Sequence, residues 1–249
     1  MMPASPPGRE PVFNAPPIVV WLLVLLLGLH VVRQALSVAT DEELLIALAF
    51  IPARYSDPTA VAEWPGGATA LLTSFVSHAL VHGNWGHLAF NSVWLLAMGG
   101  AVAPRLGVLR FLAFLAFCST CGALAFLVSN PGLAQPMVGA SGAIAGLMGA
   151  TMRFLFSALD KGAMRRLRHE PRSVPLTPLL ETLRDRRVLL ATAIWLVLNG
   201  LAAVGVSLGD IEGGIAWEAH LGGYFAGLLS FGLFDVQMRN AKANESSVL

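Results

Sequence analysis

The chain alternates between long apolar stretches and shorter polar connections, and six of the stretches are long enough to be membrane-spanning helices. About 20 apolar residues cross the hydrocarbon core of a bilayer as a helix. The pattern therefore predicts an all-α polytopic membrane protein, with a six-transmembrane-helix bundle within residues 18–235. The six predicted spans are Ile18–Leu36, Trp85–Ala103, Val108–Val128, Val138–Leu159, Val188–Leu208 and Ile215–Phe234.

The connection after the first span, residues 37–80, is a long outer loop rather than a simple turn. Connections longer than about 12–15 residues are usually functional or disordered. This one holds two apolar pieces too short to span, Leu44–Phe50 and Leu71–Phe75, which we expect to lie at the membrane interface. Residues 1–17, rich in proline, predict a disordered cytoplasmic arm, and residues 236–249 predict a cytoplasmic tail.

Composition supports a membrane protein. Hydrophobic residues make up 55% of the 249 positions and charged residues only 12%, whereas a soluble domain carries about 25% charged residues. The mean hydropathy is +0.67. The net charge of +1 gives no reason to expect a nucleic-acid partner, and the lipid bilayer is the expected surrounding.

The basic residues predict the orientation, because cytoplasmic loops carry an excess of Lys and Arg. The connection between the fourth and fifth spans is the most basic, with Lys161, Arg165, Arg166, Arg168, Arg172, Arg184, Arg186 and Arg187. The loop after the first span is instead rich in acidic residues. We therefore expect a multi-pass protein of the cell (inner) membrane with both termini in the cytoplasm.

A serine and a histidine lie inside two of the apolar stretches, Ser141 in the fourth and His220 in the sixth. A polar or ionisable group inside a membrane span is costly unless it is partnered, so such residues mark functional sites. With a rise of 1.5 Å per residue, Ser141 lies roughly 5–10 Å below the outer surface, and His220 lies at a similar depth. His87 and Asn91 of the second span share that level, so three spans contribute polar groups to one site.

These residue types suit acyl-transfer chemistry. A serine becomes nucleophilic when a base takes its proton, and a neutral His220 is such a base. No Asp or Glu lies deep within the spans at this level, so we expect a dyad whose imidazole is oriented by packing or by a neutral group. The free N–H of Ser141 in the first turn of its helix, with His87 and Asn91 on one face of theirs, are candidate oxyanion donors.

Glycines flank both residues, and small residues allow membrane helices to approach closely. Near the serine these are Gly139, Gly142 and Gly146. After the histidine, Gly223 and Gly227 form a Gly-x-x-x-Gly.

Taken together, the motifs resemble those of the rhomboid intramembrane serine proteases. They are His78-x-x-x-His82-x-x-x-x-His87-x-x-x-Asn91, Gly139-x-Ser141-Gly142 and His220-x-x-Gly223-x-x-x-Gly227. The resemblance implies the six-helix bacterial form of this fold. It also implies an endopeptidase that cuts single-pass membrane proteins in or near their spanning segment.

By this resemblance, Ser141 is the nucleophile and His220 the general base. His87, Asn91 and the Ser141 N–H form the oxyanion hole. The supporting positions are His82, Gly139, Gly142, Gly223 and Gly227. No cofactor and no metal is implied, and the oligomeric state is left open.

Two positions depart from the family pattern. Many members carry an aromatic residue four positions after the nucleophile, packed on the base histidine, and here that residue is Ala145. The Trp-Arg pair that some members carry in the outer loop is absent, so we expect the loop to be anchored differently. Phe90, Trp217 and Tyr224 are candidates to compensate for Ala145.

Other interpretations of the same residues are weaker. A non-catalytic rhomboid-like protein that binds transmembrane segments is the main alternative, but such relatives usually lack the nucleophile or the base. A transporter is less favoured, because inverted repeats are not evident. The three histidines at positions 78, 82 and 87 have metal-like spacing without a carboxylate or thiol to complete a site. Cys118 and Cys121 are better explained as small buried residues one helical turn apart than as a redox or metal pair.

Overall fold

The structure is a computed structural model that describes residues 15–56, 64–203 and 215–235. Across these residues the chain is helical, and its only extended pairing is an isolated bridge between Phe50 and Met137. The predicted tail over 236–249 and residues 1–14 of the predicted arm lie outside the described residues.

The described helices form an all-α polytopic membrane bundle, which confirms the predicted fold class. Three of them are long and apolar enough to cross a membrane: α1 (Pro17–Gln34), α4 (Trp85–Leu106) and α5 (Val108–Ser129). The other three predicted spans correspond to α6 (Ser141–Met152), α10 (Arg186–Ala203) and α11 (Trp217–Phe234).

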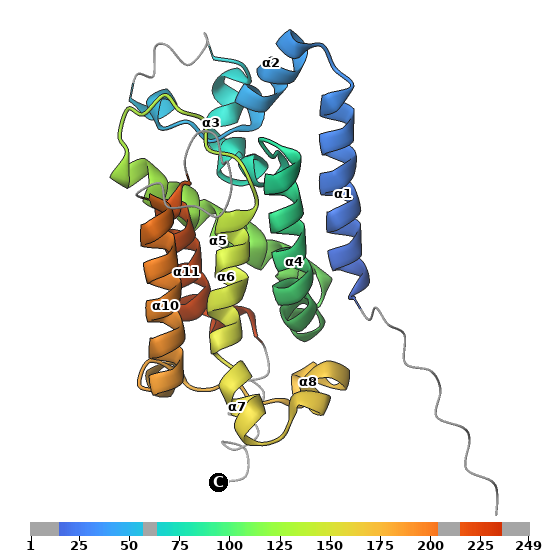
Figure 1. The fold of residues 1–249 in the computed structure, drawn as a ribbon, viewed down its shortest axis with the longest axis vertical. Helices are drawn as coiled ribbons and strands as arrows, with labels where there is room; N and C mark the ends of the chain where they lie inside the picture. Colours follow the sequence, from blue (N-terminus) through green and yellow to red (C-terminus); the bar gives the residue numbers. More distant parts are fainter. Residues whose placement is uncertain (1–14, 57–63, 204–214, 236–249) are drawn as a thin grey trace, which may run out of the picture.

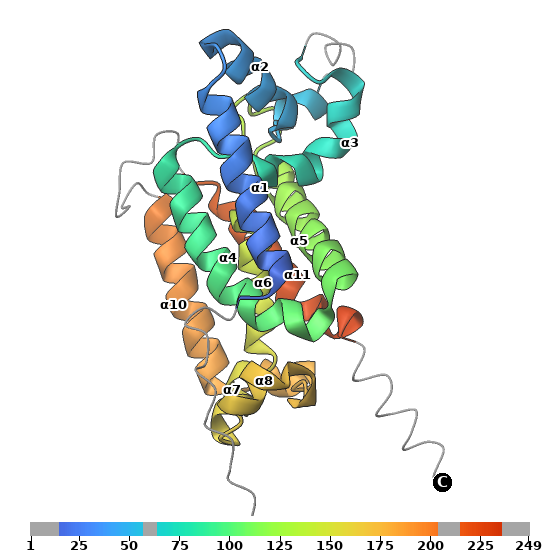
Figure 2. The same cartoon turned by 90° about the vertical axis from the view of Figure 1, so that its right-hand side faces the viewer.

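Helix α6 is the centre of the bundle. It contacts α4, α5 and α11, while α1 packs on the outside of α4 (Figures 1 and 2). Nine of the twelve residues of α6 are buried, whereas α10 leaves one face of Ile194, Val197 and Leu198 exposed. The helix that carries the serine is therefore held on several sides.

The predicted bounds of the fourth span, Val138–Leu159, are wrong at both ends. Gly139 has φ +110°, outside helical values, so the helix begins only at Ser141. At the other end the helix stops at Met152, and α7 (Leu155–Asp160) follows. Arg153, the residue directly after Met152, is buried and donates hydrogen bonds to the carbonyls of Thr177 and Leu228, 3.0–3.2 Å away.

The outer loop folds into α2 (Val38–Leu48), η1 (Pro52–Tyr55), α3 (Gly67–Ser77) and η3 (His78–Leu80), at one end of the bundle (Figures 1 and 2). Its organising residue is Arg54, which is only 1% exposed. The guanidinium of Arg54 donates to the carbonyls of Ala49, Ile46 and Pro65. It also lies 5.8 Å from the ring centre of Trp64, so an arginine and a tryptophan meet here although they are not adjacent in sequence.

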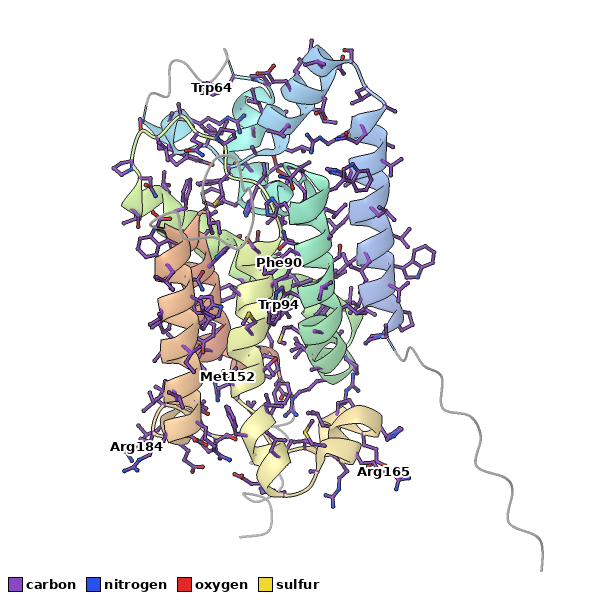
Figure 3. The ribbon with its side chains drawn as sticks, viewed as in Figure 1. Trp64, Phe90, Trp94, Met152, Arg165 and Arg184 are labelled. Carbon is purple, nitrogen blue, oxygen red and sulfur yellow. The ribbon has the colours of Figure 1, made fainter. Side chains whose placement is uncertain are left out.

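The basic connection lies at the opposite end, in α7, α8 (Met164–His169), η4 (Pro171–Ser173) and α9 (Leu179–Thr182). Arg105 is buried there, paired with Asp235 and donating to the carbonyls of Pro171 and Val174. In contrast, Arg165 and Arg184 project away from the bundle (Figure 3). The buried arginines Arg105 and Arg153 therefore tie the connection to the bundle, while other arginines of the connection stay exposed.

Candidate active site

Ser141 and His220 are in hydrogen-bond contact, 2.7 Å apart between Oγ and Nε2. Ser141 is the first residue of α6, and His220 lies in the first turn of α11. The two residues are 79 positions apart in sequence, so their contact depends on how α6 and α11 pack.

That packing is a crossing of two glycine-lined backbones. A Cβ added at Gly223 would overlap the carbonyl oxygen of Gly142, and a Cβ at Gly227 would overlap that of Gly146. Only hydrogen fits at these positions, because the backbones themselves touch. The short distance between the serine and the histidine follows from this close approach.

Gly139 shapes the chain just before the serine. Its φ of +110° strains any residue with a side chain, and its N–H donates to the carbonyl of His78 at 2.8 Å. A Cβ there would lie 2.5 Å from Nε2 of His87 and 3.4 Å from Nδ2 of Asn91. The side chains of His87 and Asn91 therefore approach the backbone two residues before Ser141.

Hydrogen-bond donors collect beside the serine. Asn91 is 1% exposed, and its Nδ2 finds no acceptor in the described part of the chain. The first N–H groups of α6 lack intrahelical acceptors, and Ala140 provides no side-chain cap. An unpaired buried amide is costly, so these donors indicate a place for an acceptor that arrives from outside.

His82 lies behind this group of donors. It is 1% exposed, and its ring centre is 5.1 Å from that of His87. The carbonyl of His82 accepts a hydrogen bond from Arg33 at 2.7 Å, and Arg33 also pairs with Asp41. The structure therefore connects His82 to α1 and the outer loop rather than to Ser141 directly.

A cavity of about 360 Å³ joins these groups to the surface. Its rim includes the exposed residues Gly83, Asn84, Gln135 and Pro136. Its inner wall includes six of the predicted site residues: His87, Asn91, Gly139, Ser141, Gly142 and His220. His82, Gly223 and Gly227 lie outside this lining.

The second ring nitrogen of His220, Nδ1, contacts a residue that the sequence did not lead us to predict. Asn199 of α10 lies with its Oδ1 2.8 Å from Nδ1 of His220. An amide inside the otherwise apolar fifth span was the available sign, since polar groups in membrane spans are costly.

The place beside Ala145 is filled from α11 instead of α6. Ala145 packs with Tyr224 and Leu228. The Tyr224 ring stacks on Trp195 with centres 4.4 Å apart, and its hydroxyl lies 2.6 Å from that of Thr192. Of the three candidates for compensating the missing aromatic residue, Tyr224 is the one that packs on Ala145.

The alternative metal and redox sites find no geometric support within the described ranges. No three His, Cys, Asp or Glu side chains there are grouped to hold a metal ion. Cys118 and Cys121 are unpaired, and Cys118 is buried against Gly146, where a Cβ would meet its sulfur.

The fold and the site together define a polytopic membrane protein with a serine–histidine pair at the crossing of two helices, open to a surface cavity. A family model described as the Rhomboid domain matches residues 70–235, which is more than half of the chain. The protein belongs to the rhomboid family, as the motifs indicated.

A curated relative is the "Rhomboid protease GluP" of Bacillus subtilis (strain 168), 35% identical over 126 residues. The match covers 51% of this chain and 22% of the Bacillus protein. The chain thus spans about a fifth of the length of that relative.

Proposed function

We propose that this protein is an intramembrane serine endopeptidase that hydrolyses peptide bonds in or near transmembrane segments. The observation that carries the proposal is the 2.7 Å contact between Ser141 Oγ and His220 Nε2. A serine beside an imidazole is the arrangement that makes a nucleophile at neutral pH. The cavity beside the pair supplies a path for water, without which no hydrolysis occurs inside a bilayer.

In the proposed reaction, Ser141 Oγ attacks the carbonyl carbon of the scissile bond while Nε2 of His220 takes the hydroxyl proton. The resulting tetrahedral intermediate collapses, the C–N bond breaks, and His220 returns the proton to the departing amine. Water then attacks the acyl-serine with His220 again acting as base. This releases the new carboxyl terminus and restores the serine.

The negative charge on the intermediate requires donors that are already in position. The N–H of Ser141 at the positive end of α6 and the Asn91 amide fit this role. His87 adds a third donor when its Nε2 carries a hydrogen. The approach of the His87 and Asn91 side chains to Gly139, two residues before Ser141, supports an oxyanion hole at this spot.

The expected substrates are single-pass membrane proteins, in keeping with the family. For the orientation, the basic residues of the α7–α9 segment support a cytoplasmic position for that end, because Lys and Arg favour the cytoplasmic side. Both termini are then cytoplasmic, the cavity opens on the outer side, and the protein resides in the cell (inner) membrane.

The test is cleavage of a model single-pass substrate by protein reconstituted in liposomes. Wild-type protein should cut it, and Ser141→Ala and His220→Ala should each abolish cutting. A fluorophosphonate probe should label wild-type protein and fail to label either variant. Unchanged cleavage by Ser141→Ala would eliminate the mechanism. Absence of cleavage by folded, substrate-binding wild-type protein would instead favour the non-catalytic binder.

Ser119 offers a matched control, because it is a buried serine whose hydroxyl lies beside a histidine. Its Oγ lies 3.4 Å from Nε2 of His78. Ser119→Ala should be labelled by the fluorophosphonate probe as wild-type protein is, since this serine does not line the cavity. Excess EDTA should leave cleavage unchanged, and loss of activity would point back to a metal.

A further inference from the structure

Asn199 connects the imidazole of His220 to α10 through two directed hydrogen bonds. Its Nδ2 donates to the carbonyl of Trp195 at 2.9 Å, and its Oδ1 lies 2.8 Å from Nδ1 of His220. The carbonyl of Trp195 is held by the backbone of α10, and His220 is held by the packing of α11. The amide therefore has one orientation in which each of its ends is satisfied.

This orientation determines where the imidazole proton sits. A carbonyl oxygen such as that of Trp195 accepts only, so the Asn199 end facing it is the NH₂ group. The end facing His220 is then the amide oxygen, which also accepts only. Nδ1 must carry the hydrogen, and a neutral imidazole then presents a lone pair at Nε2 toward the hydroxyl of Ser141.

We propose that Asn199 is the positioning residue for the base: it selects the tautomer of His220 and fixes the plane of its ring. The inference rests on the proposed function, since it matters only if His220 takes a proton. Asn199 is neutral and touches no reacting atom, so it acts through the imidazole alone. It takes the orienting role that a buried carboxylate has in a Ser-His-Asp triad.

No carboxylate takes this place in the described part of the chain. Glu218 is the acidic residue that lines the cavity, and it accepts a hydrogen bond from Nδ2 of Asn130 at 3.0 Å. His87 of α4 is the titratable group that acts electrostatically on His220, and both residues line the cavity. Asn199 is the hydrogen-bond partner of Nδ1.

A second hydrogen bond between α10 and α11 provides a matched control. The hydroxyl groups of Thr192 and Tyr224 lie 2.6 Å apart in a hydrogen bond. Thr192 lies about two helical turns before Asn199 on α10. Thr192→Ala loosens the docking of α10 without touching His220. Asn199→Ala loosens the same docking and also frees the imidazole, so the difference between the variants measures positioning.

The experiment compares cleavage kinetics in liposomes, after Ser141→Ala has shown that wild-type cleavage depends on the serine. Asn199→Ala should lower kcat by about 10- to 100-fold, because misplacing a catalytic group by about 1 Å costs this much, with KM nearly unchanged. The rate of fluorophosphonate labelling should fall in parallel. Thr192→Ala should stay within about 3-fold of wild type in kcat.

Asn199→Asp keeps an acceptor at the same distance and should restore most of kcat. Its carboxylate also favours the charged imidazolium, so the acid limb of the pH–rate profile should move to higher pH. The proposal is overturned if Asn199→Ala keeps wild-type kcat, or if Thr192→Ala loses as much as Asn199→Ala. If Asn199→Ala does not fold, Asn199→Asp provides the test: a pH–rate profile whose acid limb stays at the wild-type pH would also overturn the proposal. Wild-type protein that never cleaves contradicts the proposed function instead.

Discussion

The glycine crossing of α6 and α11 leads to a sharp expectation for Gly223→Ala. The new Cβ would overlap the carbonyl oxygen of Gly142, and that oxygen belongs to the backbone next to Ser141. Neither group can rotate away, and non-bonded carbon atoms need about 3.5 Å. The two helices must therefore separate by about 1 Å or more at this point.

A separation of that size breaks the contact on which the proposed chemistry depends. Adding about 1 Å to the 2.7 Å between Ser141 Oγ and His220 Nε2 gives a distance beyond hydrogen bonding. We expect kcat to fall by about 100-fold. Forcing an extra carbon into this packed interface should also lower the free energy of unfolding by about 1–3 kcal/mol or more.

The assay is liposome cleavage together with thermal unfolding of the same preparations. Gly232→Ala is the matched control on α11, because a Cβ there would meet Leu176 at 3.5 Å and Arg153 at 3.8 Å, which are ordinary contacts. Its kcat should stay within about twofold of wild type. Normal kcat and an unchanged unfolding midpoint in Gly223→Ala would refute the reasoning that backbone contact brings the pair together.

Three further outcomes are expected. Asn91→Ala should lower kcat by about 10²–10³-fold if its amide is an oxyanion donor, measured by single-turnover cleavage, and a normal rate would assign Asn91 to packing alone. Arg54→Ala should lower the free energy of unfolding by about 2–4 kcal/mol, because the buried carbonyls that it binds lose their donor. Amide hydrogen exchange in the outer loop should then become faster, and exchange as slow as in wild-type protein would contradict this. The Arg187 guanidinium donates hydrogen bonds to the carboxylates of Asp160 and Asp185 and holds the pKa of each below its ordinary value. The stability that these ion pairs contribute is therefore fully present at pH values above the ordinary carboxyl pKa. It is lost as the pH falls through the lowered pKa values. Arg187→Gln should therefore destabilise the protein at pH 7 and not at strongly acid pH, and a difference that is the same at both pH values in thermal unfolding would argue against the ion pairs.

The composition and the apolar stretches were sufficient to predict the fold class. Length and hydropathy predict membrane helices because the bilayer sets a minimum apolar length. The same reasoning failed at the ends of the fourth span. Gly139 leaves helical geometry and the Arg153 side chain turns inward to the carbonyls of Thr177 and Leu228, and neither event has a hydropathy pattern.

The depth argument predicted which residues share a level, since the rise of a helix converts sequence position into distance. It could not predict lateral distance. Ser141 and His220 meet because Gly142 and Gly223 have no side chains between them. That Gly142 faces Gly223 in particular depends on the register of two helices that are far apart in sequence.

The sequence by itself determined that this is a helical membrane protein with a serine, histidines and an asparagine buried at one depth, because hydrophobic length and the cost of buried polar groups are local properties. Only the tertiary structure decided which polar groups touch. Asn199 faces His220, Tyr224 fills the space beside Ala145, and Arg54 meets Trp64. Each of these contacts joins segments whose relative rotation and register are fixed by packing across the whole bundle, and no single stretch of sequence carries that information.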